Sequence, residues 1–301
     1  MKILITGGAG FVGYHLTKKL ISLGHDIIIL DDLSTGKKKN IVKNSKFVKD
    51  SILNSKCVSN LVKKVDLVFH LAAKVELQES IVNPEECFLV NVVGTANIVK
   101  NCVFYKKKLI FASSCSVYPL KIKSPISEKN ILEGNSPYSI SKIVCENLIN
   151  FYSKKFNLKA VILRFFNIYG ERQNVNSAYS AVIPTFINNV SQDKILKLYG
   201  SGKQKRDFIN INDVVEAYIY FILSNKIGIY NVGSGRVTSI KHLASLIIKI
   251  TGKGKTKNLP ALSGDAMYSC ADISKIKKEL NFKPKKTLKE GITHLINMSI
   301  K

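Results

Sequence analysis

The feature that most constrains the fold is a regular alternation between short apolar runs and stretches with the apolar spacing of a helix. The β-branched or apolar runs lie at residues 3–6, 26–30, 47–49, 67–70, 109–112 and 160–163. Strands joined through helices run parallel, with right-handed crossovers and helices on both faces of the sheet. The alternation therefore predicts an α/β protein with a doubly wound parallel (Rossmann) sheet, whose ligands bind beyond the carboxyl ends of the strands.

The remainder of the chain follows a different pattern. After Asn167 the alternation loosens into loops rich in Asn, Ser and Gly between shorter elements. A chain of 301 residues is long enough for two domains, and its 46% hydrophobic content allows a buried core without disulfides or metals. We expect a Rossmann domain at 1–166 and a second, smaller α/β substrate-binding domain at 167–301, and part of 207–232 could return to the first domain.

The composition is strongly basic, with 46 Lys and Arg against 21 Asp and Glu and a net charge of +25. Such a balance suits nucleic acid or an anionic membrane surface. Only four of the basic residues are arginine, the usual reader of base edges, and the lysines form short scattered runs without interleaved aromatic side chains. A solvated lysine-rich surface is therefore favoured over a polyanion patch, and nucleic acid is not an expected partner.

Cysteine usage and apolar runs indicate the compartment. The six cysteines are scattered, without a C-x-x-C pair, so we expect reduced thiols, no disulfide and no metal site. No apolar run reaches the roughly 18 residues of a membrane span. The apolar start at 1–5 leads into a glycine turn instead of a cleavage site. A cytoplasmic protein without a membrane span is the expectation.

A glycine-rich turn follows the first predicted strand. Gly7, Gly10 and Gly13 stand between that strand and a helical pattern that continues through Leu23. Glycine permits unusual backbone angles and close approach of a pyrophosphate, whose charge then lies at the helix N-terminus. Asp31, at the end of the second strand, completes a dinucleotide-binding pattern because its carboxylate can accept hydrogen bonds from ribose hydroxyls. The same carboxylate would repel a 2′-phosphate, which favours NAD over NADP.

A tyrosine and a lysine share one face of a later helix. Pro137 is a natural helix opener, so Tyr138 and Lys142 lie four residues apart on the same face. The Lys142 ammonium and an oxidised nicotinamide would stabilise a phenolate and lower the pKa of Tyr138 from about 10 toward neutrality. The spacing by itself is common, and a solvated helix face is the alternative.

Longer motifs extend these observations over nearly the whole chain. Beside the glycine turn and 138–142, they lie at 31–36, Asp50, 70–73, 91–95, 112–118, 164–170, 200–208, 230–233 and 271–275. Together they resemble the extended short-chain dehydrogenase/reductase family, and within it most closely the NAD-dependent sugar-nucleotide 4-epimerases. The resemblance implies NAD as cofactor, bound by 1–166, and a nucleotide-sugar substrate, bound mainly by 167–301. It also implies a homodimer.

The resemblance further implies which residues form the site. The catalytic residues would be Ser114, Tyr138 and Lys142. The cofactor would be bound by Gly7, Gly10, Phe11, Val12, Gly13, Asp31, Asp32, Asp50, Ser51, Leu71, Ala72, Ala73, Asn91, Tyr138, Lys142 and Phe165. The substrate would be bound by Ser114, Tyr138, Asn167, Arg206, Asp265 and Ser269. No metal is implied.

The implied reaction inverts C4 of the sugar. Tyr138, as phenolate, would take the proton of the 4′-hydroxyl directly or through Ser114, while the C4 hydride passes to NAD. The 4-ketose would turn over before hydride returns, without net redox change. UDP-glucose and UDP-galactose are the expected substrates. Ser269 stands where relatives of plain-hexose specificity carry a bulky tyrosine, which leaves room for the N-acetylated forms.

Departures from the family pattern leave alternatives open. Leu262 replaces an arginine, Pro119 a glycine, and Val75 and Glu76 differ at positions near nicotinamide or sugar. Residues 114–116 read Ser-Cys-Ser, without the acid that family dehydratases and decarboxylases carry. A dehydratase, decarboxylase, reductase or 3,5-epimerase nevertheless stays an alternative. A non-catalytic NAD- or RNA-binding scaffold is the alternative of another class.

Overall fold

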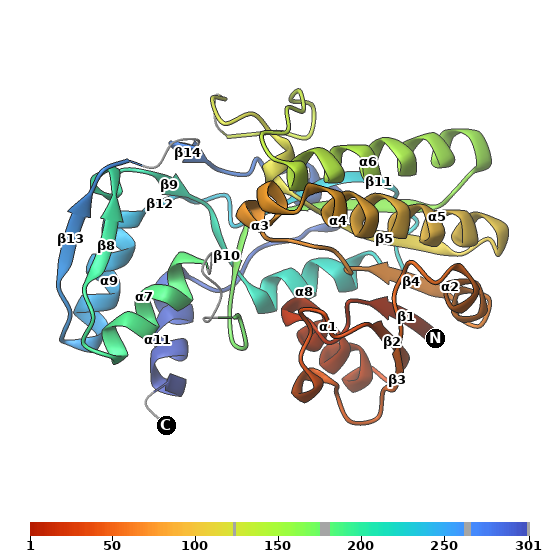
Figure 1. Ribbon diagram of the computed structural model, residues 1–301, viewed down its shortest axis with the longest axis horizontal. Helices are drawn as coiled ribbons and strands as arrows, with labels where there is room; N and C mark the ends of the chain where they lie inside the picture. The colour runs from red at the N-terminus through yellow and green to blue at the C-terminus, as the bar shows by residue number, and fades with distance from the viewer. Residues whose placement is uncertain (123–124, 175–180, 262–265, 300–301) are drawn as a thin grey trace. The chain divides into compact units, whose positions relative to one another are not determined.

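The computed structural model describes residues 1–122, 125–174, 181–261 and 266–299, and these form two compact units (Figure 1). Unit 1 consists of Met1–Val117, Leu132–Arg164 and Val215–Tyr230. Unit 2 consists of Tyr118–Ile131, Phe165–Val214 and Asn231–Lys301.

A seven-stranded sheet forms the centre of unit 1, in the order β11-β6-β5-β4-β1-β2-β3. Its strands are β1 (Lys2–Thr6), β2 (Asp26–Asp31), β3 (Lys46–Lys49), β4 (Leu67–His70), β5 (Lys108–Ser114), β6 (Ala160–Phe165) and β11 (Gly228–Val232). The pairings that join β3, β2, β1, β4 and β5 are parallel. The predicted doubly wound α/β fold is therefore confirmed, and the carboxyl ends of these strands share one edge.

Helices cover both faces of this sheet (Figure 1). They are α1 (Phe11–Ser22), α2 (Ser55–Val62), α3 (Leu77–Val82), α4 (Pro84–Phe88), α5 (Gly94–Phe104), α6 (Pro137–Phe156) and α8 (Ile211–Tyr220), with short turns η1 (Lys38–Asn40), η2 (Leu89–Val93) and η3 (Cys115–Val117). A hydrophobic core packs α2, α5 and α6 onto the sheet through apolar residues such as Val58, Ile98 and Ile149. Burial of such side chains contributes about 1.5–3 kcal/mol each.

One helical stretch of unit 1 has the length and composition of a membrane span. It is Pro84–Phe104, which joins α4, η2 and α5, and 39% of its most apolar window is buried. Core helices meet the same criteria, and α5 packs against α2 and α6 within unit 1. Among the described residues, no cluster of three or more His, Cys, Asp or Glu side chains could hold a metal ion.

The described residues of unit 2 form three small sheets and a separate core. The sheets are β10-β7, β12-β9-β14 and β13-β8. Their strands are β7 (Asn167–Tyr169), β8 (Leu196–Tyr199), β9 (Lys205–Arg206), β10 (Phe208–Asn210), β12 (Thr238–Ser239), β13 (Thr256–Leu259) and β14 (Tyr268–Ser269), and the helices are α7 (Val182–Ser191), η4 (Gly200–Gly202), α9 (Ile240–Thr251), α10 (Ser274–Leu280) and α11 (Leu288–Ser299). Phe186, Leu198, Leu243 and Ile292 belong to the core that α7, α9 and α11 form with these strands.

The division of the chain differs from the expected 1–166 and 167–301 at two segments. Tyr118–Ile131 belongs to unit 2, because Ile126 bridges to Ala271 and exchanges backbone hydrogen bonds with Cys270 and Asp272. Val215–Tyr230 belongs to unit 1, because β11 extends the sheet beyond β6. The second segment lies within 207–232, the part that the sequence left open.

Candidate active site

The glycine turn lies where β1 ends and α1 begins. Gly7 has a φ of +70°, and a Cβ there would come within 2.7 Å of the Ala72 nitrogen. A Cβ at Gly13 would collide with the Gly7 carbonyl oxygen. The first turn of α1, which includes Phe11 and Val12, has no side-chain cap and no acidic residue. Its unpaired N–H groups and the helix dipole can therefore hold an anion such as a pyrophosphate.

Asp31 joins this turn to the end of β2. Its carboxylate is buried, and its two oxygens accept the Ala9 and Leu33 N–H groups, both at 2.9 Å. Burial raises the pKa of Asp31, while these two hydrogen bonds lower it. Each oxygen retains a lone pair for a further donor. The exposed neighbour Asp32 accepts the Ser34 N–H at 2.8 Å, so its carboxylate shapes the following loop.

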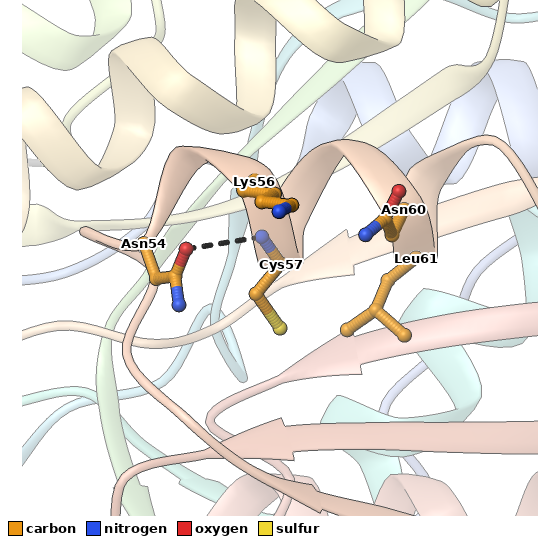
Figure 2. Close-up of a pocket in the computed structure, with 5 residues that line it drawn as sticks. All are labelled: Asn54, Lys56, Cys57, Asn60 and Leu61. Atoms are coloured by element: carbon orange, nitrogen blue, oxygen red, sulfur yellow. Dashed lines mark hydrogen bonds between the residues drawn. The ribbon is translucent and has the colours of Figure 1, made fainter.

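Asp50 and Ser51 form the turn before α2. Asp50 accepts the Ser51 N–H at 2.7 Å and the Asn54 side-chain amide at 2.8 Å, and Ser51 Oγ accepts the Leu53 N–H at 3.2 Å. A hollow of about 300 Å³ lies beside this turn, lined by Asn54, Lys56, Cys57, Asn60 and Leu61 (Figure 2). None of its lining residues is an expected site residue, and burial raises the pKa of Cys57 to about 11.

A buried histidine supports the loop of Leu71, Ala72 and Ala73. His70 Nδ1 lies 2.7 Å from Thr6 Oγ1, and its Nε2 lies 2.9 Å from Thr95 Oγ1. Thr6 Oγ1 also accepts the Ala72 N–H at 3.2 Å. Burial, and next the Lys142 charge, lower the pKa of His70 to about 3. His70 is therefore neutral at physiological pH and ties β1, β4 and α5 to this loop.

Asn91 lies in η2, a single turn of π-helix, the kind of local irregularity frequent at functional sites. Its Oδ1 accepts the Lys74 N–H at 2.8 Å, and its Nδ2 donates to the Lys74 carbonyl at 3.0 Å and to Ser141 Oγ at 2.9 Å. The side chain thus holds the loop after Ala73 against α6. Its expected contact with a cofactor stays a prediction.

Ser114, Tyr138 and Lys142 come together between β5 and α6. Ser136 caps α6 through a capping box with Ser139, and Pro137 opens its first turn, which fixes Tyr138 and Lys142 on one face. Ser114 hydrogen-bonds the Tyr138 hydroxyl. Lys142 Nζ donates to the Ala112 carbonyl at 2.8 Å and lies 5.9 Å from the centre of the Tyr138 ring. The three predicted catalytic residues therefore form one cluster.

The predicted lowering of the Tyr138 pKa depends on an oxidised nicotinamide as well as on Lys142, and it stays a prediction; without that second cation the pKa is raised. Burial raises the pKa of Tyr138 to about 12; the Ser114 hydrogen bond opposes this, and nearby Cys115 adds to it. Lys142 is itself buried, which lowers its own pKa, and its ammonium is directed to the Ala112 carbonyl. Desolvation thus outweighs the stabilisation that a cation on the same helix face was expected to give.

A buried ion pair supports this cluster from one turn further along α6. Arg164 of β6 donates from Nε to both oxygens of the Glu146 carboxylate, at 3.0 and 3.2 Å, and from Nη2 to Oε2 at 2.6 Å. Ser113 Oγ donates to the same carboxylate at 2.5 Å. Both charged side chains are at most 2% exposed. Together with Ser113, the ion pair links β5, β6 and α6 next to Ser114 and one helical turn after Lys142.

In unit 2, three of the expected substrate residues surround Asp207. Arg206 and Ser269 are register partners in the parallel pair β9 and β14. Asn167 Nδ2 donates to the Asp207 carbonyl at 3.0 Å. Phe165 is buried at the end of β6, as a packing residue would be. Asp265, together with Leu262, lies outside the described residues.

Known proteins identify the family of this fold and site. The model of the NAD dependent epimerase/dehydratase family matches residues 3–233. The chain belongs to this family. The cofactor that its glycine turn, uncapped helix and buried Asp31 fit is therefore NAD, as predicted.

Individual relatives match over the full length. A putative UDP-glucose 4-epimerase of Methanocaldococcus jannaschii is 36% identical over 98% of this chain and 97% of its own. The structure of a Thermotoga maritima UDP-glucose 4-epimerase with UDP-glucose has a TM-score of 0.95 at 31% identity, with both chains fully covered. A Methanobrevibacter ruminantium UDP-N-acetylglucosamine 4-epimerase in complex with UDP-N-acetylmuramic acid has the same TM-score and identity, with 99% and 98% covered. Other similar proteins bear the names of decarboxylases and a 4,6-dehydratase.

The sequence reasoning missed three supporting residues. His70 and Asp207 stand inside motifs that the sequence singles out, and Glu146 lies four residues after Lys142. A histidine at the end of a buried strand and a carboxylate four residues beyond Lys142, a predicted catalytic residue, were the available signals. What the sequence does not contain is their burial, which turns them from ordinary polar residues into fixed hydrogen-bonding centres.

Proposed function

We propose that this protein is an NAD-dependent epimerase that inverts C4 of a UDP-sugar through a 4-keto intermediate. The observation that carries the proposal is the cluster of Ser114, Tyr138 and Lys142 at the carboxyl edge of the sheet, the edge at which the glycine turn also lies. A hydroxyl bonded to a buried phenol, with an ammonium on the next helical turn, can move a proton to and from a sugar hydroxyl.

Each residue has a separate task in this reaction. Tyr138 accepts the proton of the 4′-hydroxyl and returns it, and Ser114 holds the phenolic oxygen by a hydrogen bond. Lys142 is fixed by the Ala112 carbonyl and supplies the positive charge that favours the phenolate. Bound NAD supplies the oxidising capacity at C4 and is restored at the end of the cycle. The low proton affinity of His70 keeps a second positive charge away from Lys142.

The nucleotide diphosphate is assigned to unit 2. Arg206 offers a planar fork of donors that suits two phosphate oxygens. Asn167 hydrogen-bonds the carbonyl of Asp207, the residue after Arg206, and Ser269 is the register partner of Arg206 and small enough to leave room for an acetamido group on the sugar. UDP-glucose, UDP-galactose and their N-acetylated forms are therefore the proposed substrates.

The residues beside the proposed base favour epimerisation over the sister reactions. Elimination of water or loss of a carboxylate requires an added acid or base near the sugar. The strand end and turn after it supply Ser114, Cys115 and Ser116, none of which is an acid. Beside the hydride exchange that bound NAD would supply, epimerisation needs only the proton carrier that this cluster provides.

The test is a product analysis. Purified protein with NAD is incubated with UDP-glucose, UDP-galactose and their N-acetylated forms, and with GDP- and dTDP-glucose, and the products are resolved by chromatography and NMR. We expect the C4 epimer of the UDP-sugars and no accumulation of NADH. Release of CO₂ or a stable 4-keto-6-deoxy sugar would contradict the proposal.

A matched pair of variants assigns the base. Tyr138→Phe removes the proton acceptor, so turnover should fall by about 10²- to 10⁴-fold while NAD stays bound. Tyr218→Phe is the control, because Tyr218 is also a fully buried tyrosine of unit 1 but packs edge-on against Phe69. A Tyr138→Phe protein with wild-type turnover would place the base elsewhere.

A further inference from the structure

Asp207 occupies the point in unit 2 where the chain passes from one small sheet to another. It follows β9, which pairs with β12 and β14, and precedes β10, which pairs with β7. Its own backbone takes part in both connections. The Asp207 N–H donates to the Ser269 carbonyl at 2.9 Å, and its carbonyl accepts the Asn167 N–H at 3.1 Å.

The Asp207 carboxylate is completely buried and has four donors around it. Oδ1 accepts the N–H and the hydroxyl of Ser234 at 2.7 and 2.6 Å. Oδ2 accepts the N–H groups of Gly235 and Ala271 at 3.0 and 3.1 Å. Burial raises the pKa of Asp207, and these four hydrogen bonds lower it. The packing is tight, because a Cβ at Gly233 would lie 2.6 Å from Oδ2.

These contacts place Asp207 at the centre of the residues assigned to the nucleotide sugar, with Arg206 and Asn167 for its diphosphate and Ser269 for its sugar. Arg206 is its direct neighbour, Ser269 is hydrogen-bonded to its nitrogen, and Asn167 binds its carbonyl through both backbone and side chain. The carboxylate also anchors the turn at Ser234 and the strand end at Ala271. A shift of this carboxylate would therefore move the strands that carry all three residues.

We propose that Asp207 is a positioning residue for binding of the nucleotide diphosphate, acting chiefly by fixing the backbone of Arg206. The inference rests on the proposed function, since it assigns the ligand of unit 2 as a nucleoside diphosphate. The carboxylate itself does not bind the ligand, because its oxygens are occupied by the four donors. Geometric precision matters here, because a bidentate guanidinium loses affinity when its fork is misdirected.

Asp213 offers a matched control in the same unit. It is also buried, at 3% exposure, and its carboxylate accepts the N–H groups of Lys285 and Lys286 at 2.9 and 3.1 Å. Its two oxygens thus hold the segment before α11, whereas those of Asp207 hold the Ser234 turn and the strand end at Ala271. Asp207→Asn and Asp213→Asn remove the same charge from similar surroundings, but only Asp207 is bonded to that turn and strand end.

The experiment measures UDP binding by calorimetry with the NAD-loaded full-length protein. We expect Asp207→Asn to bind UDP at least tenfold more weakly, with NAD content unchanged, because its amide N–H group would face N–H donors. Ser234→Ala removes the hydroxyl donor to Oδ1 and keeps the backbone N–H donor, so it should also weaken UDP binding, but less than Asp207→Asn does. Asp213→Asn should stay within about twofold of wild type. Equal losses in Asp207→Asn and Asp213→Asn would overturn the positioning role.

A double-mutant cycle tests the route through Arg206. If Asp207 acts by orienting that side chain, the effect of Asp207→Asn should shrink at least threefold in an Arg206→Ala background. Additive effects would overturn the inference. Unchanged UDP binding in both Asp207→Asn and Ser234→Ala would overturn it while the proposed function stands. A wild-type protein that binds none of UDP, GDP and dTDP would overturn both.

Discussion

His70 is a titratable side chain that stays neutral in the folded protein because it is buried. It is fully buried between Thr6 and Thr95, and protonation would leave an uncompensated charge beside the Lys142 ammonium. Its pKa in the folded protein is about 3, against 6.5 for an ordinary histidine. Between pH 3 and pH 6.5, this histidine therefore binds a proton in the unfolded chain but not in the folded protein.

This difference predicts how stability depends on pH. Between pH 6.5 and pH 3 the unfolded state binds more protons, so His70 makes the free energy of unfolding fall as pH falls, by up to about 1.4 kcal/mol per pH unit. Asp31, Asp207 and Asp213, whose pKa values are raised, act in the opposite direction over their own range. Wild type should thus lose stability relative to His70→Gln below pH 6, measured by urea unfolding at pH 7, 6, 5 and 4. Parallel curves for the two proteins would show that His70 is protonated when folded.

The small side chain of Ser269 leads to a prediction about which sugar substituents the substrate can carry. It is the register partner of Arg206 and is half-buried at the end of β14. A tyrosine there would fill the space assigned to an acetamido group, and overpacking typically costs about 1–3 kcal/mol, or roughly 5- to 150-fold in rate. Ser269→Tyr should therefore lower kcat/KM for UDP-N-acetylglucosamine and its epimer by this factor and spare UDP-glucose. Ser269→Ala is the control, and an equal loss for both sugar classes would refute the assignment.

At the level of single residues, the sequence reveals spacing but not burial. The glycine turn and the shared helix face of Tyr138 and Lys142 could be predicted, because a turn conformation and helix periodicity are local properties of the chain. The raised pKa of Tyr138 in the protein without cofactor could not, because it follows from desolvation in the folded core. Asp207 could not either, since its carboxylate binds donors 27 to 64 residues away in the chain.

At the level of elements, α6 is the part on which the site most depends. Its N-terminal half carries Tyr138 and Lys142, and Glu146 joins it to β6 through Arg164. A buried ion pair gains little over apolar packing, but removal of one partner leaves an unpaired charge and costs about 3–5 kcal/mol. The main effect of the pair is therefore to fix the position of α6 on the sheet, and its net contribution to stability is small.

A set of three variants tests this view of the ion pair. Arg164→Met should lower the free energy of unfolding by about 3–5 kcal/mol, because Glu146 stays buried without its partner. The double variant Arg164→Met with Glu146→Leu should recover most of that loss. Chemical denaturation of these variants, of Glu146→Leu alone and of wild type gives both quantities. A double variant as unstable as Arg164→Met alone would mean that the pair itself supplies the stability.

The predicted strands agree with the observed ones wherever the apolar pattern is continuous. The run at 67–70 is β4, and 26–30 and 160–163 lie inside β2 and β6. The sequence pattern did not predict β11, Gly228–Val232, as a strand of this sheet, because it stands after the region of regular alternation and joins the sheet through long-range pairing next to β6. The pairing partner of such a strand is a tertiary property that local pattern does not contain.

At the scale of the whole molecule, each of the two units has a core and a set of candidate site residues. Unit 1 holds the glycine turn and the proposed catalytic cluster, and unit 2 holds Asp207 and the residues around it. The chain passes repeatedly from one unit to the other within residues 117–231. Because each unit contains segments from distant parts of the chain, a fragment that ends at residue 166 would lack β11 and α8.

The outer faces of two helices of unit 1 indicate how whole molecules associate. Ile140, Val144 and Phe151 of α6 are 37–56% exposed. Leu89 and Val93 of η2, which leads into α5, are nearly half exposed, and α5 packs against α6 (Figure 1). Large apolar side chains gathered on adjacent helices mark an interaction surface. We propose that this surface is the interface of the predicted homodimer.

The last prediction concerns this interface. Wild-type protein at micromolar concentration should have twice the 33.5 kDa mass of one chain in light scattering after size-exclusion chromatography. Val144→Glu combined with Phe151→Glu places two charges on the exposed face of α6, and burial of unpaired charges should convert the protein to monomer while the fold of each unit persists. Leu223→Glu is the matched control, because Leu223 is 87% exposed but lies beyond α8, outside the proposed interface. A monomeric wild type, or a dimer that survives the double variant, would exclude this surface as the interface.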